Sequence, residues 1–89
     1  MFRLMGTIFK DTHILKSTVI CDATERTRTK KVFGSLENIC HEFDLEKPLW
    51  LEKNKKEFIR HARTRFTQDN FIEQIEFDYL DFQVIEEDY

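Results

Sequence analysis

The chain has 89 residues, 40% of them hydrophobic, and its nine Phe, two Tyr and one Trp are typical of one small globular domain rather than a disordered chain. Two Gly and one Pro leave little material for a Gly-rich phosphate-binding loop or a flexible linker. The net charge of −3 conceals an asymmetry, since residues 1–68 carry +5 and residues 69–89 carry −8, and it excludes no class of partner because these regions can neutralise each other.

No stretch approaches the roughly 18 apolar residues that a membrane span needs, and Lys10 and Asp11 interrupt the N-terminal segment before it reaches signal-peptide length. We therefore expect a soluble, cytoplasmic protein. Cys21 and Cys40 both have apolar neighbours, which favours two free buried thiols over a disulfide.

Residues 2–9 and 14–21 are rich in β-branched and aromatic side chains, and the polar segment between them has the length of a hairpin turn. We expect an antiparallel β-hairpin, with Phe2, Leu4 and Ile8 on one face of the first strand. Both faces of the second strand are apolar, which predicts a strand that is covered on both sides or lies centrally in the sheet.

Residues 29–43 carry apolar side chains at spacings of three, four and seven, the pattern of an α-helix with one apolar face. Gly34 lies inside this helix and indicates either close packing or a tolerated weakness. The predicted buried face contains Phe33, Leu36, Ile39 and Phe43, which we expect to pack together against the sheet.

Residues 48–51, PLWL, predict a buried extended segment, with a short strand as an alternative, leading into a second helix. Asn54 with Glu57 three residues later resembles a capping box, so Asn54 is the predicted N-cap. On that phasing three residues face the core and four basic residues lie on the opposite side. The core set is Phe58, Ile59 and Ala62, and the basic set is Lys53, Lys56, Arg60 and Arg63.

The apolar pattern of residues 75–87 changes phase, because Phe77 and Tyr79 are odd-numbered whereas Leu80, Phe82 and Val84 are even-numbered. Either a β-bulge lies between residues 78 and 80, or different halves of the strand are apolar on different faces. We expect the even-numbered set to lie under the helices. Phe77 and Tyr79 would then point to the opposite face and form a possible interface with a second copy.

The basic set, extended by Arg65, is a possible site for an anion or a protein partner, and such a row also suits a nucleic-acid backbone. The alternative is a solvated helix face, partly neutralised by the acidic side chains of the last strand. No exposed aromatic side chain is interleaved with the basic residues, so a stacking platform for single strands is not predicted. The solvated or internally paired face is the favoured interpretation.

No Cys-x-x-Cys or His-Glu-x-x-His motif is present, and the side chains of Cys40 and His41 diverge by about 100° on a helix. Glu57 and His61 have the spacing of an ordinary pair on a helix surface. The sequence therefore names no catalytic, cofactor-binding or metal-binding residue, and a small enzyme is the third choice of function.

The segments WLEKNKKEF (50–58) and TRFTQDNFIEQIEFDYLDFQVIE (64–86) resemble a group of small uncharacterised proteins from clostridia and related Gram-positive bacteria. The resemblance covers most of the chain and implies a stand-alone bacterial domain in the cytoplasm. It implies no activity, cofactor or site residue.

Taken together, residues 1–89 predict one α+β domain: a mostly antiparallel sheet made of the N-terminal hairpin and a long C-terminal strand, with two helices on one face. The favoured function is a non-enzymatic protein-interaction or scaffold domain, which includes the possibility of a homo-oligomer. The alternative is a nucleic-acid-binding accessory protein that uses the basic helix face.

Overall fold

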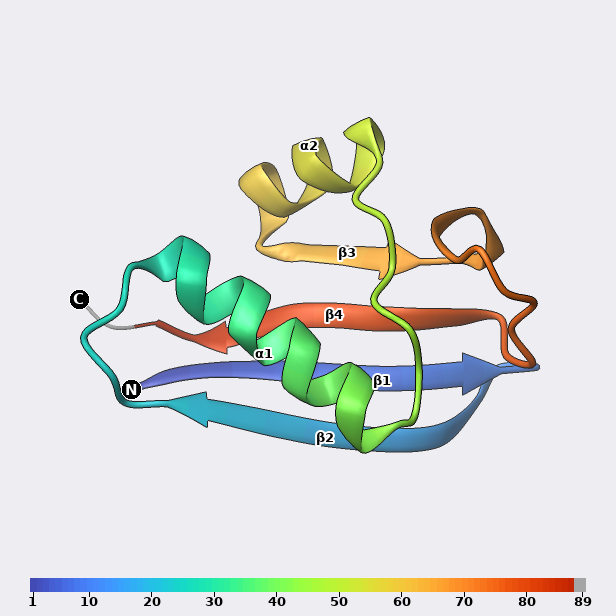
Figure 1. The fold of residues 1–89 in the computed structure, drawn as a ribbon, viewed down its shortest axis with the longest axis horizontal. Helices are drawn as coiled ribbons and strands as arrows, with labels where there is room; N and C mark the ends of the chain where they lie inside the picture. The colour runs from blue at the N-terminus through green and yellow to red at the C-terminus, as the bar shows by residue number, and fades with distance from the viewer. Residues whose placement is uncertain (88–89) are drawn as a thin grey trace.

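The structure, a computed structural model, describes residues 1–87 and confirms the α+β fold. An antiparallel sheet has the strand order β2-β1-β4-β3 (Figure 1). The elements in chain order are β1 (Phe2–Lys10), β2 (His13–Asp22), α1 (Arg28–Glu42), α2 (Glu52–His61), β3 (Arg63–Phe66), a 3₁₀ turn (Gln68–Asn70) and β4 (Tyr79–Glu86). Neither helix in this part of the chain is long and apolar enough to cross a membrane.

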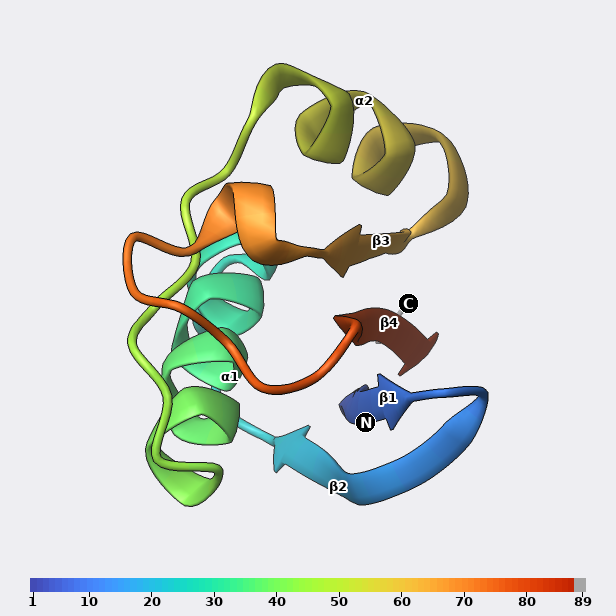
Figure 2. The same ribbon diagram turned by 90° about the vertical axis from the view of Figure 1, so that its right-hand side faces the viewer.

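The two helices have different positions relative to the sheet. Figure 2 shows α1 on one side of the sheet and α2 beyond β3, while the opposite side of the sheet carries no helix of the described chain. Both helices contribute to one core, because Phe58 of α2 is buried with the side chains of α1. The core is thus closed by α1 over β1 and β2 and by α2 at the β3 edge.

The predicted hairpin is confirmed, but the predicted position of its second strand is wrong. β2 pairs with β1 alone and forms one edge of the sheet, so Ile14 and Val19 are exposed rather than covered. The apolar pattern on both of its faces arises because one face packs under α1 while the other lies on the uncovered side. Cys21, which we expected to be buried, is exposed on that side.

The predicted helix at 29–43 is confirmed within one residue, and its N-cap is Thr27, whose Oγ1 accepts a hydrogen bond from the Lys30 amide. Leu36, Ile39 and Phe43 are buried as expected. Phe33 is 51% exposed, so its predicted place in the core is wrong. Val32 and Cys40 are buried as well, which shows that the inward face is rotated away from Phe33.

The connection from β2 to α1 is held by Asp22, which accepts hydrogen bonds from the Thr24 hydroxyl (2.6 Å) and the Thr24 amide (2.9 Å). These bonds, together with the Arg26 guanidinium 2.5 Å from the carboxylate, lower the pKa of Asp22 to about 2. Asp22 therefore remains charged at any pH at which the domain is normally handled. The turn keeps its ion pair throughout that range.

The last strand begins only at Tyr79, because residue 75 lies outside any strand and residues 76–78 form a bend. Leu80 and Phe82 are buried in the core and Val84 packs against it, so the even-numbered set faces inward as predicted. The expectation that Phe77 shares the opposite face with Tyr79 is wrong. Phe77 packs against the core and meets Phe71 edge-to-face at 5.9 Å, so the phase change marks the entry into the strand.

Gly6 of β1 allows α1 to approach the sheet closely. A Cβ atom at Gly6 would lie 2.8 Å from Ile39 Cδ1 and Cγ2, a distance that requires a shift of the helix or of the side chain. At Gly34, by contrast, the atom nearest to such a Cβ is Nη2 of Arg26, at 3.1 Å, at the end of a flexible side chain.

We predict that Gly6→Ala lowers the free energy of unfolding by about 1–3 kcal/mol, because the added methyl overpacks the contact between β1 and α1. Gly34→Ala is the matched control and should be neutral or stabilising by up to about 1 kcal/mol, since Ala is the better helix former. Urea titration followed by circular dichroism measures both changes. Equal stability of the two variants would contradict the close approach at Gly6.

Candidate binding groove

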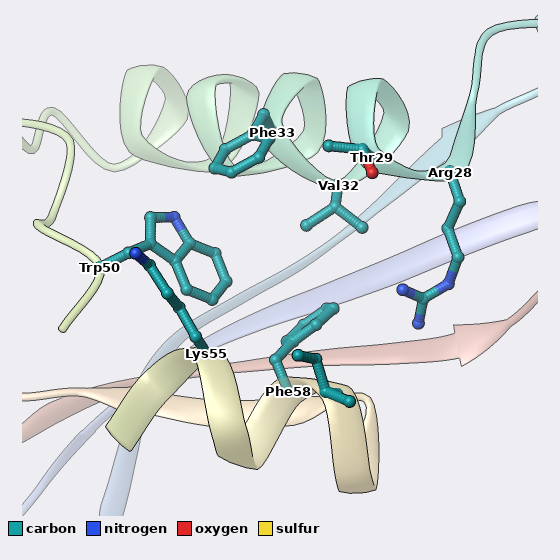
Figure 3. Close-up of a pocket in the computed structure, with 8 residues that line it drawn as sticks. Arg28, Thr29, Val32, Phe33, Trp50, Lys55 and Phe58 are labelled. Carbon is teal, nitrogen blue, oxygen red and sulfur yellow. The ribbon is translucent and has the colours of Figure 1, made fainter. Parts of the chain in front are cut away.

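An apolar groove lies between α1 and α2 and encloses about 300 Å³. Figure 3 shows Val32 and Phe33 of α1 and Phe58 of α2 pointing into the space between the two helices, with the ring of Trp50 at one end of that space. The residues that line the groove are Arg28, Thr29, Val32, Phe33, Trp50, Lys55, Phe58 and Ile59. No residue of this set is acidic.

Trp50, the only tryptophan, forms the centre of an aromatic cluster at the base of the groove. Its ring meets those of Phe33 (5.7 Å), Phe58 (5.5 Å), Phe66 (5.1 Å) and Phe82 (6.0 Å), each close to edge-to-face. This geometry is the preferred one for aromatic pairs and fixes the orientation of the indole. The indole Nε1–H is buried and has no acceptor within residues 1–87.

Two large apolar side chains on the walls of the groove remain in water. Ile59, predicted to face the core, is 85% exposed, and Phe33 on the facing helix is 51% exposed. The prediction failed for Ile59 because adjacent side chains on a helix diverge by about 100°, and Phe58 is the one that α2 directs into the core. Apolar side chains of this size beside an open groove are typical of a surface that another molecule covers.

The charged groups of the groove are cations on opposite walls. Arg28 of α1 stacks over the Phe58 ring at 5.5 Å and forms an ion pair through its Nε with Glu87. Lys55 of α2 makes no ion pair with any described residue. The groove therefore combines an apolar base with positive charge at its edges.

A buried pair of side-chain amides holds the segment that carries Trp50. Asn70 Nδ2 donates to Asn54 Oδ1 (2.7 Å) and to the Leu49 carbonyl (2.6 Å), and Asn54 Oδ1 also accepts from the Leu51 amide (3.1 Å). Both asparagines are fully buried. The residues on each side of Trp50 are thus fixed by hydrogen bonds, although residues 48–51 form no strand.

The sequence-based interpretation of Asn54 as an N-cap is wrong. α2 begins at Glu52, so Asn54 lies inside the first turn and its amide Nδ2 instead donates to Thr64 Oγ1 (2.8 Å) and the Arg65 carbonyl (3.0 Å). Asn54 therefore ties α2 to β3, a strand that the sequence did not indicate. The sequence shows only an Asn three residues after Leu51, which does not distinguish a residue inside the first turn from an N-cap.

The predicted basic set is divided by the end of α2 at His61. Lys53, Lys56 and Arg60 are exposed on the helix, whereas Arg63 and Arg65 lie on β3. A continuous row of four on one helix face is therefore wrong.

Arg63 and Arg65 belong to the uncovered face of the sheet. Arg63 makes two hydrogen bonds to the buried carboxylate of Asp81 (3.0 and 2.9 Å), and this contact raises the pKa of Arg63 above its ordinary value. The Arg65 guanidinium lies 4.5 Å from the centre of the Tyr79 ring, whose other neighbour is Phe9 at 5.1 Å. Tyr79 is thus already stacked with side chains of its own chain.

Two other kinds of site, a metal centre and a reactive cysteine, were considered next to the groove in residues 1–87. Within residues 1–87 no group of three or more His, Cys, Asp or Glu is arranged to hold a metal ion. Burial raises the pKa of the Cys40 thiol to about 11, so this cysteine stays protonated and unreactive at neutral pH. No family model, curated protein or solved structure matches the chain.

We predict that Asn70→Ala lowers the free energy of unfolding by about 1–3 kcal/mol, because it leaves Asn54 Oδ1 and the Leu49 carbonyl short of a donor. Trp50 emission in the folded state should shift to longer wavelength as water reaches the loosened segment. Asn38→Ala on the exposed side of α1 is the control and should change stability by less than about 0.5 kcal/mol. Equal denaturation midpoints for the two variants would contradict a structural role of the amide pair.

Proposed function

We propose that this chain is a non-enzymatic protein-interaction domain, and that the groove between α1 and α2 binds an acidic segment of another protein. The observation that carries the proposal is the combination of a Trp-centred apolar base with Arg28 and Lys55 on opposite walls and no acidic lining residue. Aromatic side chains in a pocket beside basic groups are typical of the residues that dominate protein interfaces.

The charge around the groove supports an acidic partner over a neutral one. Lys53, Lys56 and Arg60 are exposed on the same helix as Lys55 and add positive potential near the groove. Such charges raise the rate of encounter with an acidic partner even where they make no contact in the complex. The basic residues selected from the sequence thus have a role in this proposal without being anion ligands.

The composition of the lining fits a binding surface. Its polar members are Arg28, Thr29 and Lys55, and no His, Cys or carboxylate accompanies them. General acid–base or nucleophilic catalysis needs such groups within hydrogen-bonding reach of one another.

Selection of random 16-residue peptides on the immobilised protein tests the proposal, with Trp50 fluorescence as the binding signal. We expect the selected peptides to combine apolar and acidic residues and to shift the emission of Trp50. Ile59→Ser should weaken binding about tenfold or more, as expected for an interface anchor. Ile72→Ser is the matched control, since Ile72 is 82% exposed and is not among the groove residues.

Failure to select any peptide, or equal binding by the Ile59→Ser and Ile72→Ser variants, would contradict the proposal. A second copy of the chain is the alternative occupant. Light scattering distinguishes the two by measuring the molar mass of the protein in solution. A dimer that becomes a monomer on Ile59→Ser substitution would show that the groove binds a second copy and not a different protein.

For nucleic acid, the alternative function, we predict no sub-micromolar binding at 150 mM salt. Three phosphate contacts by Lys53, Lys56 and Arg60 would give a salt slope of about −2.7, so binding would weaken about 40-fold between 50 and 200 mM salt. The ring of Tyr79 already contacts Phe9 and the guanidinium of Arg65. It is therefore not free to stack on a nucleic-acid base.

A titration with mixed single- and double-stranded DNA and RNA checks this prediction. Tight binding at 150 mM salt that is abolished by reversing the charge of Lys56 and Arg60 would make the basic face of α2 the functional site instead. Reversal of both Lys10 and Lys47, two exposed lysines outside α2, serves as the charge-matched control.

A further inference from the structure

We infer that the segment received by the groove is an acidic amphipathic helix, and that Glu87 of this same chain competes with it for Arg28. The inference rests on the proposed function and names both the kind of partner and a residue that limits its affinity.

The walls of the groove favour a helix over an extended peptide. Both walls are helices, whose backbone groups are already hydrogen-bonded within α1 and α2. The facing edge of β3 is engaged in part by Asn54, which donates to the Arg65 carbonyl. An extended occupant of the groove would therefore run between two helices and not along a strand, whereas a helix satisfies its own backbone and needs only side-chain contacts.

The position of the cations fits carboxylates at the ends of such a helix. Arg28 is the first residue of α1 and Lys55 is the fourth of α2, and Figure 3 shows the two on different walls and toward opposite ends of the groove. Both are near the N-terminal end of their helix, where the helix dipole adds positive potential. A helix with apolar side chains every three or four residues would place those side chains near Trp50, Phe33 and Ile59.

Arg28 is already occupied by an acid of its own chain. Glu87 directly follows β4 and its Oε1 forms an ion pair with Arg28 Nε, while the two side chains remain 26% and 49% exposed. An exposed ion pair of this kind is weak, so an incoming carboxylate can replace Glu87 at a small cost. Glu87 thus lowers the affinity for an acidic partner without closing the groove.

Glu86 supplies a matched control for Glu87. It is the adjacent acid, but its carboxylate contacts the amino group of Met1 (3.0 Å) and lies 3.7 Å from Arg3. Glu86→Gln and Glu87→Gln change the net charge of the protein equally, and only the second removes a group from Arg28. A difference between these variants therefore reports the contact and not the overall charge.

The test uses a synthetic 18-residue probe helix with Leu at positions 6, 9 and 13 and Glu near both ends, titrated against the full chain by Trp50 fluorescence. A second probe replaces each Glu by Gln, and a third carries Pro at position 10. We expect the Glu probe to bind at least about fivefold more tightly than the Gln probe at 50 mM salt, and the Pro probe to bind most weakly.

Glu87→Gln should raise the affinity for the Glu probe about two- to fivefold, and Glu86→Gln should leave it unchanged. Arg28→Gln should weaken binding, and in the Arg28→Gln background the gain from Glu87→Gln should disappear. Lys55→Gln is a second variant, and it should lower the affinity for the Glu probe without involving Glu87. Circular dichroism confirms that each variant is folded.

Equal affinity of Glu86→Gln and Glu87→Gln, or of the Glu and Gln probes, would overturn the competition at Arg28 while the groove remained a binding site. Equal affinity of the Pro probe would overturn the helical partner. If no probe and no selected peptide perturbs Trp50, the proposed function itself fails.

Discussion

The hydrogen bond between the side-chain amides of Asn54 and Asn70 is the contact on which the β3 half of the molecule depends. Both amides are shielded from water, so each needs the other, and a carbonyl or amide group of the backbone, to offset the loss of hydration. Together they connect the segment before α2, the start of α2, β3 and the 3₁₀ turn. Four short pieces of chain, each too small to be stable alone, are thereby held in one arrangement.

The groove follows from that arrangement. The segment from residue 48 to 51 is short and has no strand partner, yet Trp50 lies against the rings of Phe58, Phe66 and Phe82 because its neighbours Leu49 and Leu51 are held. With Trp50 fixed, α1 and α2 stand apart on either side of it. The space between them stays open because Phe33 and Ile59 extend along its walls instead of filling its base.

The sequence predicted the elements whose pattern is regular and local. The hairpin, α1 and the inward set of β4 follow from spacings of two, three and four residues, which depend only on strand and helix geometry. The failures concern tertiary choices. A 15-residue helix with Val32 and Phe33 adjacent can turn either side chain inward, and the rotation that places Ile39 close over Gly6 is the one that leaves Phe33 outside.

The candidate site was less predictable than the fold for the same reason. β3 has four residues, two of them arginines, and no local pattern distinguishes such a strand from a loop. Arg63 was assigned to a helix because nothing in its neighbours marks Ala62 as the left-handed residue that ends α2. The walls of the groove come from residues 28–33 and 55–59, so the groove exists only once both helices are placed. The sequence therefore identified the basic residues but could not predict which side chains lie next to them.

The strand order also constrains when this molecule can form during synthesis. β4 is the last strand in the chain but lies between β1 and β3, and the Met1 amino group bonds to Glu86 at its far end. Until residues 79–86 have left the ribosome, β1 has one open edge, β3 has no strand beside it and α1 has only half a sheet to cover. The hairpin and α1 can therefore associate early, whereas β3, α2 and the Trp50 segment must wait for the final strand, and the nascent chain has to keep their apolar side chains in solution in the meantime.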